Sequence, residues 1–381
     1  MSARRTIKGL FRKALEGVDP RRRVAEALAR PSLGRALAEA RRVGVFACGK
    51  AAAGMVLGLP RKLRRGALVV LPNGYPAKGL AGCQVLFSAH PEPDSSSMRA
   101  ARRAIEFFDH FSREDAIVCL VSGGTSSLLA LPRSGVTLAS KRAAVRRLMR
   151  SGASIVEINR LRKKLSAVKG GRLGQRTRAR LVTLVLSDVP GDDPALVGSG
   201  PTIRGGSRDI TLVIGSNRIG LEAAALAASE SGLQPRVLRR WLSGEAREQG
   251  ARFARQARLL DPGEALLAGG ETAVTISGRR FDGRGGRNLE FALGAANGLD
   301  GVEDVAILSA GSDGVDGSSR AAGAVVDGRS LTRARQLGLD PARALDRHDT
   351  EPFFDSLGDL VVPGPTGTNV CDWAFALRRP R

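Results

Sequence analysis

Short apolar runs typical of buried β-strands alternate with amphipathic segments along the first half of the chain. Residues 116–121 and 181–186 are almost wholly apolar, as expected of central parallel strands covered on both faces. Further strands are predicted at residues 43–48, 67–71, 84–88 and 211–214, and helices at 2–15, 21–41, 51–59, 95–111, 126–131, 140–150, 157–167 and 218–231. This alternation predicts an α/β fold whose N-terminal domain contains a doubly wound, mostly parallel sheet.

The pattern changes around residues 234–242. Beyond it we expect strands at residues 264–268, 272–277, 305–309 and 323–326, and a helix at 289–297. A chain of 381 residues is also too long for one ordinary core. We therefore predict a Rossmann-like domain at residues 1–238 and a second, smaller α/β domain at 239–381.

Glycine is concentrated at the ends of the predicted strands. It accounts for 47 of the 381 residues, and four tracts combine it with charged or hydroxyl side chains. Glycine lets a backbone approach a ligand closely, so this pattern indicates a site for a phosphorylated small molecule. The tracts are Gly49-Lys50, Ser122-Gly123-Gly124-Thr125-Ser126, Gly283-Arg284-Gly285-Gly286-Arg287-Asn288 and Gly311-Ser312-Asp313-Gly314-Val315-Asp316-Gly317.

The composition of the chain argues against several classes of protein. The net charge of +23 raises the question of nucleic acid, but the arginines are scattered in pairs over predicted helices and aromatic residues make up only 4%. The four cysteines show no C-x-x-C spacing, and three histidines cannot supply a His-rich zinc cluster. No apolar run is long enough to span a membrane. These features predict a cytoplasmic enzyme with no nucleic-acid or membrane partner.

The first glycine tract lies one residue short of a P-loop. Residues 44–51 read G-x-x-x-x-G-K-A, with Ala51 where a Ser or Thr would bind magnesium. A turn from strand to helix directs Lys50 and free helix N–H groups toward an anion. The alternative is that Gly49 only turns the chain and that Lys50 is solvated.

The second tract follows the strand at residues 116–121 and leads into a helix. Its candidate ligand-binding residues are Ser122, Gly123, Gly124, Thr125 and Ser126, since parallel α/β sheets bind ligands at the carboxyl ends of their strands. A simple helix N-cap would explain one hydroxyl residue but not the paired glycines.

Basic residues close the predicted helix at 157–167. Lys169 and Arg172 flank Gly170-Gly171, and we interpret them as candidate phosphate contacts. The alternative is an exposed basic helix terminus that interacts with its own dipole.

Carboxylates follow two strands. Asp188 ends one strand, and Asp192 and Asp193 come shortly after it, a set of oxygen ligands that suits Mg²⁺. Asp188 capping a turn is the alternative. Asp313 and Asp316 after the strand at 305–309 fit metal ligands, a general base or turn residues equally well.

The third tract places Arg287 and Asn288 directly before a helix. An arginine on a glycine-rich loop suits a transferring phosphoryl group because its planar fork bonds two oxygens at once.

Together these motifs resemble the class II glycerate kinases, the glycerate 2-kinase family whose C-terminal half is the MOFRL domain. The matching segments occur in family order across almost the whole chain. They are Cys48-Gly49-Lys50-Ala51-Ala52, His90-Pro91-Glu92-Pro93-Asp94, Ser122-Gly123-Gly124, Lys169-Gly170-Gly171-Arg172-Leu173, Ser187-Asp188-Val189, Gly191-Asp192-Asp193, Ser199-Gly200-Pro201-Thr202, Gly269-Gly270-Glu271-Thr272, Gly285-Gly286-Arg287-Asn288 and Gly364-Pro365-Thr366-Gly367-Thr368-Asn369-Val370.

The resemblance implies phosphorylation of D-glycerate at its 2-hydroxyl by ATP with Mg²⁺. It implies that Lys50 and Arg287 are the functional pair, which we expect to stabilise phosphoryl charge from opposite domains. The tract from Ser122 to Ser126 would hold phosphate or the substrate carboxylate. Asp188 and Asp192 are expected to position the metal or the hydroxyl, and a homodimer is one candidate assembly.

Three positions depart from the family pattern. Arg320 stands where an acid is usual, Leu289 replaces a glutamine, and Lys164 replaces a histidine. Some relatives of the family are called hydroxypyruvate reductases, which gives an alternative function that would need a nicotinamide cofactor. No G-x-G-x-x-G follows any predicted strand, which argues against that cofactor.

Overall fold

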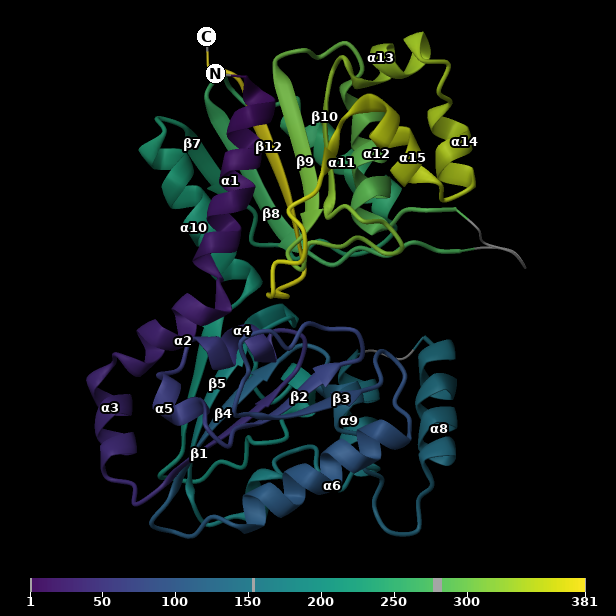
Figure 1. Cartoon of the computed structure of the whole chain (residues 1–381). Coiled ribbons are helices and arrows are strands. Elements are labelled where there is room, and N and C mark those ends of the chain that lie inside the picture. The colour runs from purple at the N-terminus through teal and green to yellow at the C-terminus, as the bar shows by residue number, and fades with distance from the viewer. Residues whose placement is uncertain (1, 153–154, 277–282, 381) are drawn as a thin grey trace. The chain divides into compact units, whose positions relative to one another are not determined.

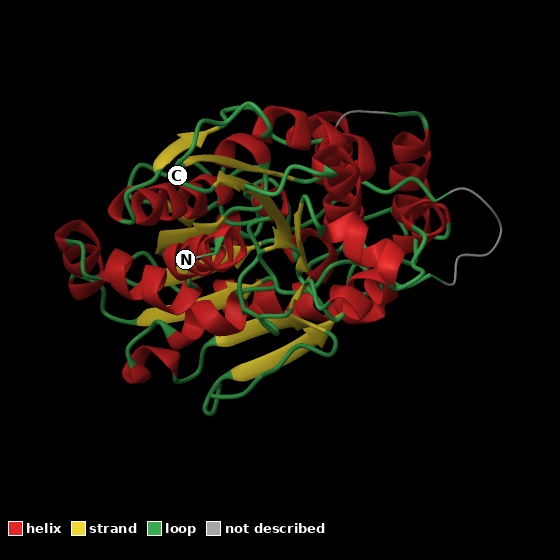
Figure 2. Cartoon of the chain, turned by 90° about the horizontal axis from the view of Figure 1, so that it is seen from above, coloured by secondary structure: helices red, strands yellow, loops and turns green. Residues whose placement is uncertain are grey.

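The computed structural model describes residues 2–152, 155–276 and 283–380, and these form two compact units. We call the unit made of Asp19–Ser216 and Gly367–Asn369 the parallel-sheet domain. The unit made of Met1–Val18, Asn217–Thr366 and Val370–Arg381 is the mixed-sheet domain. Each contains a six-stranded sheet flanked by helices (Figure 2).

All strands of the parallel-sheet domain run in the same direction, in the order β3-β2-β1-β4-β5-β6. The strand order reverses between β1 and β4, and doubly wound sheets bind ligands at such a switch point. The doubly wound fold predicted from the sequence is confirmed. The elements are α2 (Pro20–Leu28), α3 (Pro31–Ala38), β1 (Val43–Cys48), α4 (Ala52–Leu57), α5 (Arg61–Arg64), β2 (Leu68–Pro72), β3 (Gln84–Ser88), α6 (Ser95–Asp109), β4 (Ala116–Ser122), α7 (Thr125–Leu128), α8 (Leu138–Arg150), α9 (Ile155–Lys164), η1 (Gly174–Arg176), β5 (Arg180–Leu186), η2 (Pro190–Asp192), η3 (Val197–Ser199) and β6 (Ile210–Gly215).

Burial on both faces explains why the central strands are continuously apolar. All seven residues of β4 are buried, and Phe46, Ile117 and Phe108 of α6 belong to one core cluster on one face of the sheet. The opposite face packs against α4, where Met55 and Val56 are fully buried.

The sheet of the mixed-sheet domain has the order β11-β10-β9-β12-β8-β7, and β7–β8 is its parallel pair. The other neighbouring strands pair in antiparallel fashion. The elements are α1 (Ala3–Gly17), α10 (Asn217–Glu230), β7 (Gln234–Val237), α11 (Ala246–Ala257), β8 (Glu264–Gly270), α12 (Arg287–Leu299), β9 (Val305–Gly311), β10 (Gly323–Asp327), α13 (Ser330–Gln336), α14 (Pro341–Asp346), α15 (Thr350–Leu357), β11 (Leu360–Val361) and β12 (Asp372–Arg378).

Alternating side chains of β12 face two different layers of helices. Ala374 and Ala376 join the core formed with α11 and α12, whereas Trp373 lies on the other face, with its ring centroid 5.9 Å from that of Phe11 in α1. Small residues on one face let α12 approach closely, and the large ring on the other fills the space under α1 and α10. Figure 1 shows α1 and α10 on one face of this sheet and α11 and α12 on the other.

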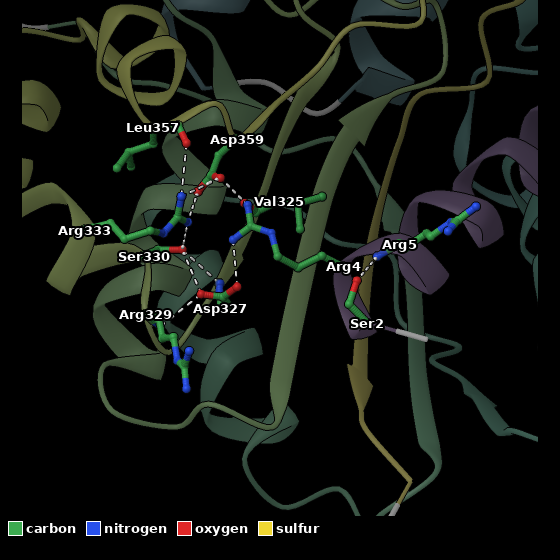
Figure 3. Close-up of polar contacts among 10 residues, drawn as sticks. All are labelled: Ser2, Arg4, Arg5, Val325, Asp327, Arg329, Ser330, Arg333, Leu357 and Asp359. Carbon is green, nitrogen blue, oxygen red and sulfur yellow. Dashed lines mark hydrogen bonds and ion pairs between the residues drawn. The ribbon is translucent and has the colours of Figure 1, made fainter.

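Helix α1 is also held to the mixed-sheet domain by charge. Arg4 pairs with Asp327 at 2.7 Å and with Asp359, and it donates to the carbonyl of Val325 at 2.9 Å (Figure 3). Arg333 bonds the same Asp359 carboxylate, so the two arginines share one buried acid.

These contacts divide the chain differently from the predicted boundary after residue 238. The mixed-sheet domain takes in Asn217 onward, because α10 and β7 pack with the second sheet, and it takes in the N-terminal helix. Residues 272–276 form a single bridge from Glu245 to Ala273 instead of the predicted strand, and residue 277 lies outside the described residues. No described helix is long and apolar enough to cross a membrane.

Candidate active site

The turns that follow β1 and β4 are bonded to each other. The strands pair in parallel up to Cys48 and Val121, so both turns leave the same edge of the sheet at the switch point. The N–H of Lys50 donates to the carbonyl of Gly123 at 2.9 Å, and the N–H of Ala51 donates to Ser122 Oγ at 3.1 Å. The two motifs that the sequence indicates as ligand-binding therefore form one structure.

Glycine is required at the contact between these turns. Gly49 has φ +126°, and a Cβ there would lie 2.2 Å from Ser122 Oγ and 2.6 Å from its carbonyl oxygen. The Thr125 hydroxyl donates to the carbonyl oxygens of Cys48 and Ser122, both at 2.8 Å. The hydroxyl groups of Ser122 and Thr125, predicted to bind a ligand, thus brace the two turns.

The paired glycines face polar side chains from other segments. A Cβ on Gly123 would lie 2.0 Å from Asp188 Oδ2 and 3.2 Å from Asn369 Nδ2. A Cβ on Gly124, whose φ is +87°, would lie 3.2 Å from the ring of His90 and 3.3 Å from the side chain of Lys50. The N–H groups of Gly123 and Gly124 donate to no acceptor within the described chain. Cationic, imidazole and carboxylate groups thus surround a backbone that has free donors.

His90 is neutral in this environment. Burial lowers the pKa of its imidazole, and the positive charge of Lys50 lowers it further, to about 4. A neutral imidazole carries one donor and one acceptor nitrogen.

Lys169 is buried beside α7. Its ammonium donates to the carbonyl and the hydroxyl of Ser126, and burial holds its pKa well below the usual range. The predicted phosphate contacts Ser126 and Lys169 therefore lie together, next to the Gly123–Gly124 turn.

The predicted magnesium ligands do not gather into a cluster. Asp188 lies beside Gly123, whereas Asp192 lies in η2 with φ +56°. Among the described residues, no group of three or more His, Cys, Asp and Glu side chains is placed to hold a metal ion. A magnesium ion bound here would therefore need oxygen ligands from its substrates.

Arg287 begins α12 in the mixed-sheet domain and is held by two carboxylates. It donates to both oxygens of Asp372, at 2.6 and 3.1 Å, and to Glu271 Oε1 at 2.6 Å. Burial alone would lower the pKa of the guanidinium, but these two carboxylates raise it. Its side chain is 34% exposed, so Arg287 is both fixed in orientation and reachable from solvent.

Asn288 and Asp316 support the start of α12. Asp316 Oδ1 accepts from the backbone and side-chain N–H groups of Asn288, at 3.1 and 3.2 Å, and Asn288 Oδ1 accepts from Ser309 at 2.8 Å. The Asp316 carboxylate thus accepts from N–H groups at the start of α12, a capping role that was not among the alternatives considered for it from the sequence. Both ends of the Asn288 amide are bonded within the domain.

Asp313 lies close to Asp372, one of the two carboxylate partners of Arg287. It accepts from the N–H of Val315 at 3.2 Å in an Asx turn. A Cβ on Gly311 would lie 3.3 Å from the carboxylates of both Asp313 and Asp372, so these two acids flank the same glycine at the end of β9.

Two family models match the chain. A model described as a domain of unknown function, DUF4147, matches residues 6–225, and the MOFRL family model matches residues 264–372. A D-glycerate 2-kinase from Thermotoga maritima is 35% identical, over 97% of this chain and 96% of its own length. The chain belongs to the glycerate 2-kinase (MOFRL) family.

A solved structure from this family has the same fold. The crystal structure of a glycerate kinase from Thermotoga maritima matches with a TM-score of 0.86 at 34% identity, covering 98% of this chain and 99% of that one. Family names are not uniform, however. A relative from Agrobacterium vitis, whose name suggests a hydroxypyruvate reductase, is 40% identical over 86% of this chain and 97% of its own length.

Arg320, the most marked departure from the pattern of the glycerate 2-kinase family, is compensated locally. Its side chain is 61% exposed and pairs with Asp355 at 2.7 Å and Glu351 at 3.4 Å, both on α15. The reversed charge shortly after the Asp313–Gly317 loop thus meets two acids from another element of the same domain.

Sequence reasoning missed three residues of these sites. Asp372 stands directly before the apolar run Trp373–Leu377, so an acid preceding a buried strand was the available signal. His90 and Asn369 were noted only as members of segments that match the family. Their positions beside Gly124 and Gly123 depend on contacts between residues distant in sequence.

Proposed function

We propose that this protein transfers the γ-phosphoryl group of ATP to the 2-hydroxyl of D-glycerate. Membership of the glycerate 2-kinase family supports the proposal. The single observation that carries it is the joined pair of turns at the β1–β4 switch point. There the Lys50 side chain lies beside Gly124, and the N–H groups of Gly123 and Gly124 have no acceptor within the described residues.

The residues at these turns fit a polyphosphate. Phosphate oxygens accept hydrogen bonds from backbone N–H groups, and glycines let them come close. We propose that Gly49, Gly123 and Gly124 form the cradle and that Ser122 and Thr125 keep its shape. Lys50 would then neutralise charge that builds up on the transferred group.

A magnesium ion fits this cradle only if oxygen atoms of the enzyme's substrates complete its coordination. Mg²⁺ in kinase sites commonly takes one or two carboxylates together with phosphate oxygens. Asp188, next to Gly123, and Asp192 are our proposed ligands at this cradle. Asp313, in the mixed-sheet domain, is a separate proposed metal ligand. When bound, the ion would neutralise phosphate charge, and Asp188 would in addition orient the acceptor hydroxyl.

We propose that Arg287, like Lys50, stabilises negative charge on a transferred phosphoryl group. Three of its N–H donors are engaged by Asp372 and Glu271, which fixes the plane of the guanidinium and leaves further donors for phosphate oxygens. A preorganised cation of this kind needs no rearrangement during the reaction. Asn288 would contribute indirectly, because its hydrogen bonds to Asp316 and Ser309 hold the start of α12 in place.

Hydroxypyruvate reduction is the second candidate, favoured by the name of the Agrobacterium vitis relative. A nicotinamide cofactor would have to bind at the same switch point. The turn after β1 reads Cys48-Gly49-Lys50-Ala51, which lacks the G-x-G-x-x-G glycines that receive a dinucleotide pyrophosphate. We therefore favour the kinase.

Two parallel incubations separate these functions. Purified protein is supplied with D-glycerate, ATP and Mg²⁺ in one, and with hydroxypyruvate and NADH or NADPH in the other. We expect ADP formation that depends on D-glycerate in the first and no cofactor oxidation in the second. Oxidation of NADH without ATP would reverse the assignment.

A further inference from the structure

Three cations of the parallel-sheet domain lie together without an acidic partner. They are Lys141 on α8, Arg162 on α9, and Lys169 on the segment after α9; we call them the cationic cluster. Lys141 is 4% exposed and Lys169 is 2% exposed. The Lys141 ammonium is buried and has no hydrogen-bond partner, and no described carboxylate forms an ion pair with any of the three.

Hydrogen bonds connect the cluster to the glycine-rich turn. The Lys169 ammonium donates to Ser126, Ser126 Oγ lies 3.4 Å from Ser199 Oγ, and Ser199 donates to Asn159 Oδ1 at 3.5 Å. Asn159 precedes Arg162 by one turn of α9. A row of hydroxyl and amide groups therefore runs between the cations and residues 123–126.

Like charges that are buried together are unfavourable unless an opposite charge joins them. Burial and the positive charge of Arg162 together lower the pKa of Lys141 to about 8, so this ammonium still carries a charge at neutral pH. Lys141 and Arg162 in turn lower the pKa of Lys169 beyond the effect of its burial. An anion bound among the three would remove this repulsion.

We infer that Lys141, Arg162 and Lys169 form the binding site for the carboxylate of a small hydroxy or keto acid. Because both lysines are almost fully buried, a small anion suits the cluster better than a nucleotide. The hydroxyl and amide groups of Ser126, Ser199 and Asn159 are suited to the hydroxyl groups of such an acid. The inference rests on the proposed function only in naming D-glycerate as that acid.

The first test replaces Lys141 by methionine, which keeps most of the length of the unbranched side chain and removes the charge. D-Glycerate binding is measured by calorimetry against its neutral amide, glyceramide, and against ATP. We expect Lys141→Met to weaken D-glycerate binding about tenfold or more, in line with the loss of a charge-assisted bond. Binding of ATP should not change, and glyceramide should bind weakly to both proteins.

Thermal unfolding without ligand gives a second readout. Because the Lys141 ammonium has no partner, Lys141→Met should leave Tm unchanged or raise it, while the stabilisation by D-glycerate is lost. Arg147→Met is the matched control, since it removes a charge from the exposed face of the same helix and should change neither readout. Should Lys141→Met lower Tm, Arg162→Gln is examined in its place, with the same loss of D-glycerate binding expected.

Unchanged D-glycerate affinity in both variants would overturn the inference, and so would weakened binding of ATP or inorganic phosphate in place of D-glycerate. Its failure can be told apart from failure of the kinase proposal. A protein that phosphorylates D-glycerate but is insensitive to both substitutions refutes the cationic cluster alone. A protein that binds D-glycerate through Lys141 yet makes no phosphorylated product refutes the kinase proposal alone.

Discussion

The backbone N–H of Lys50 lies 2.9 Å from the carbonyl oxygen of Gly123, and this hydrogen bond joins the turns after β1 and β4. Because the bond uses only main-chain atoms, a substitution of the Lys50 side chain leaves it in place. The main chain at Lys50 joins the two turns, whereas its side chain carries the positive charge. Replacing the side chain therefore tests the role of the charge without breaking the bond between the turns.

Lys50→Met should remove activity without unfolding the protein. We expect kcat to fall by about 100-fold or more, as when a preorganised charge stabiliser is lost. The Tm should stay near that of the parent because the Lys50 N–H bond remains. Lys62→Met, which removes an exposed charge from α5, is the control, and near-normal turnover in Lys50→Met would mean that the site is misplaced.

The pKa of His90 reports on Lys50 independently of catalysis. Burial and Lys50 together hold this pKa at about 4, so Lys50→Met should raise it, since a nearby positive charge disfavours imidazolium. The chain has only three histidines, so an NMR titration can follow each one. An unshifted pKa of His90 would contradict the proximity of the His90 and Lys50 side chains.

Two glycines of the site should respond differently to alanine. Gly49→Ala should lower stability by about 1–3 kcal/mol, because φ is +126° and the new Cβ meets backbone atoms of Ser122 and Gly123. Gly123→Ala meets mainly the movable Asp188 carboxylate, so it should reduce turnover with a smaller loss of stability. Urea unfolding and steady-state kinetics measure both effects. Gly9→Ala in α1, where the Cβ meets nothing within 4 Å, should be neutral or stabilising.

Arg287→Ala should reduce both activity and stability. Asp372 is 11% exposed and would lose its bidentate partner, at a cost of about 2–4 kcal/mol in the free energy of unfolding. The double variant Arg287→Ala/Asp372→Ala should recover stability but not kcat, because the cation remains absent. Recovery of kcat in the double variant would show that Arg287 serves only to neutralise Asp372.

Phe11→Ala tests the attachment of the N-terminal helix to the mixed-sheet domain. Phe11 is 3% exposed and contacts Trp373, so its loss should lower stability by about 3–5 kcal/mol. The neighbouring Arg12→Ala removes a side chain that is 74% exposed and should have almost no effect. Equal Tm values for the two variants would argue against this packing.

The sequence predicted the fold best where the residues of a single strand or turn determine its structure. The apolar run of β4 and the glycines after β1 and β4 predicted the parallel sheet and the tight turns at one edge of it, because burial and tight turns impose strong local requirements. The ligand-binding role of these turns stays a prediction. Residues 272–276 show the limit, since their predicted strand is reduced to one bridge.

Contacts between distant segments were not visible in the sequence. Nothing local to α1 indicates that Phe11 packs on Trp373, and β12 was missed because it alternates large and small residues at the end of the chain. Lys141 has the sequence context of a solvated helix rich in arginine, and only the packing of α8 and α9 reveals that it is buried.

The central claim is that the phosphoryl group is transferred to the 2-hydroxyl of D-glycerate. The most direct measurement is a proton-coupled phosphorus NMR spectrum of the product formed from D-glycerate and ATP. Phosphorylation at the 2-hydroxyl predicts a doublet, because one hydrogen lies on the adjacent carbon. A triplet from the two hydrogens at carbon 3, or the absence of any new phosphate ester, would contradict the assignment as a glycerate 2-kinase.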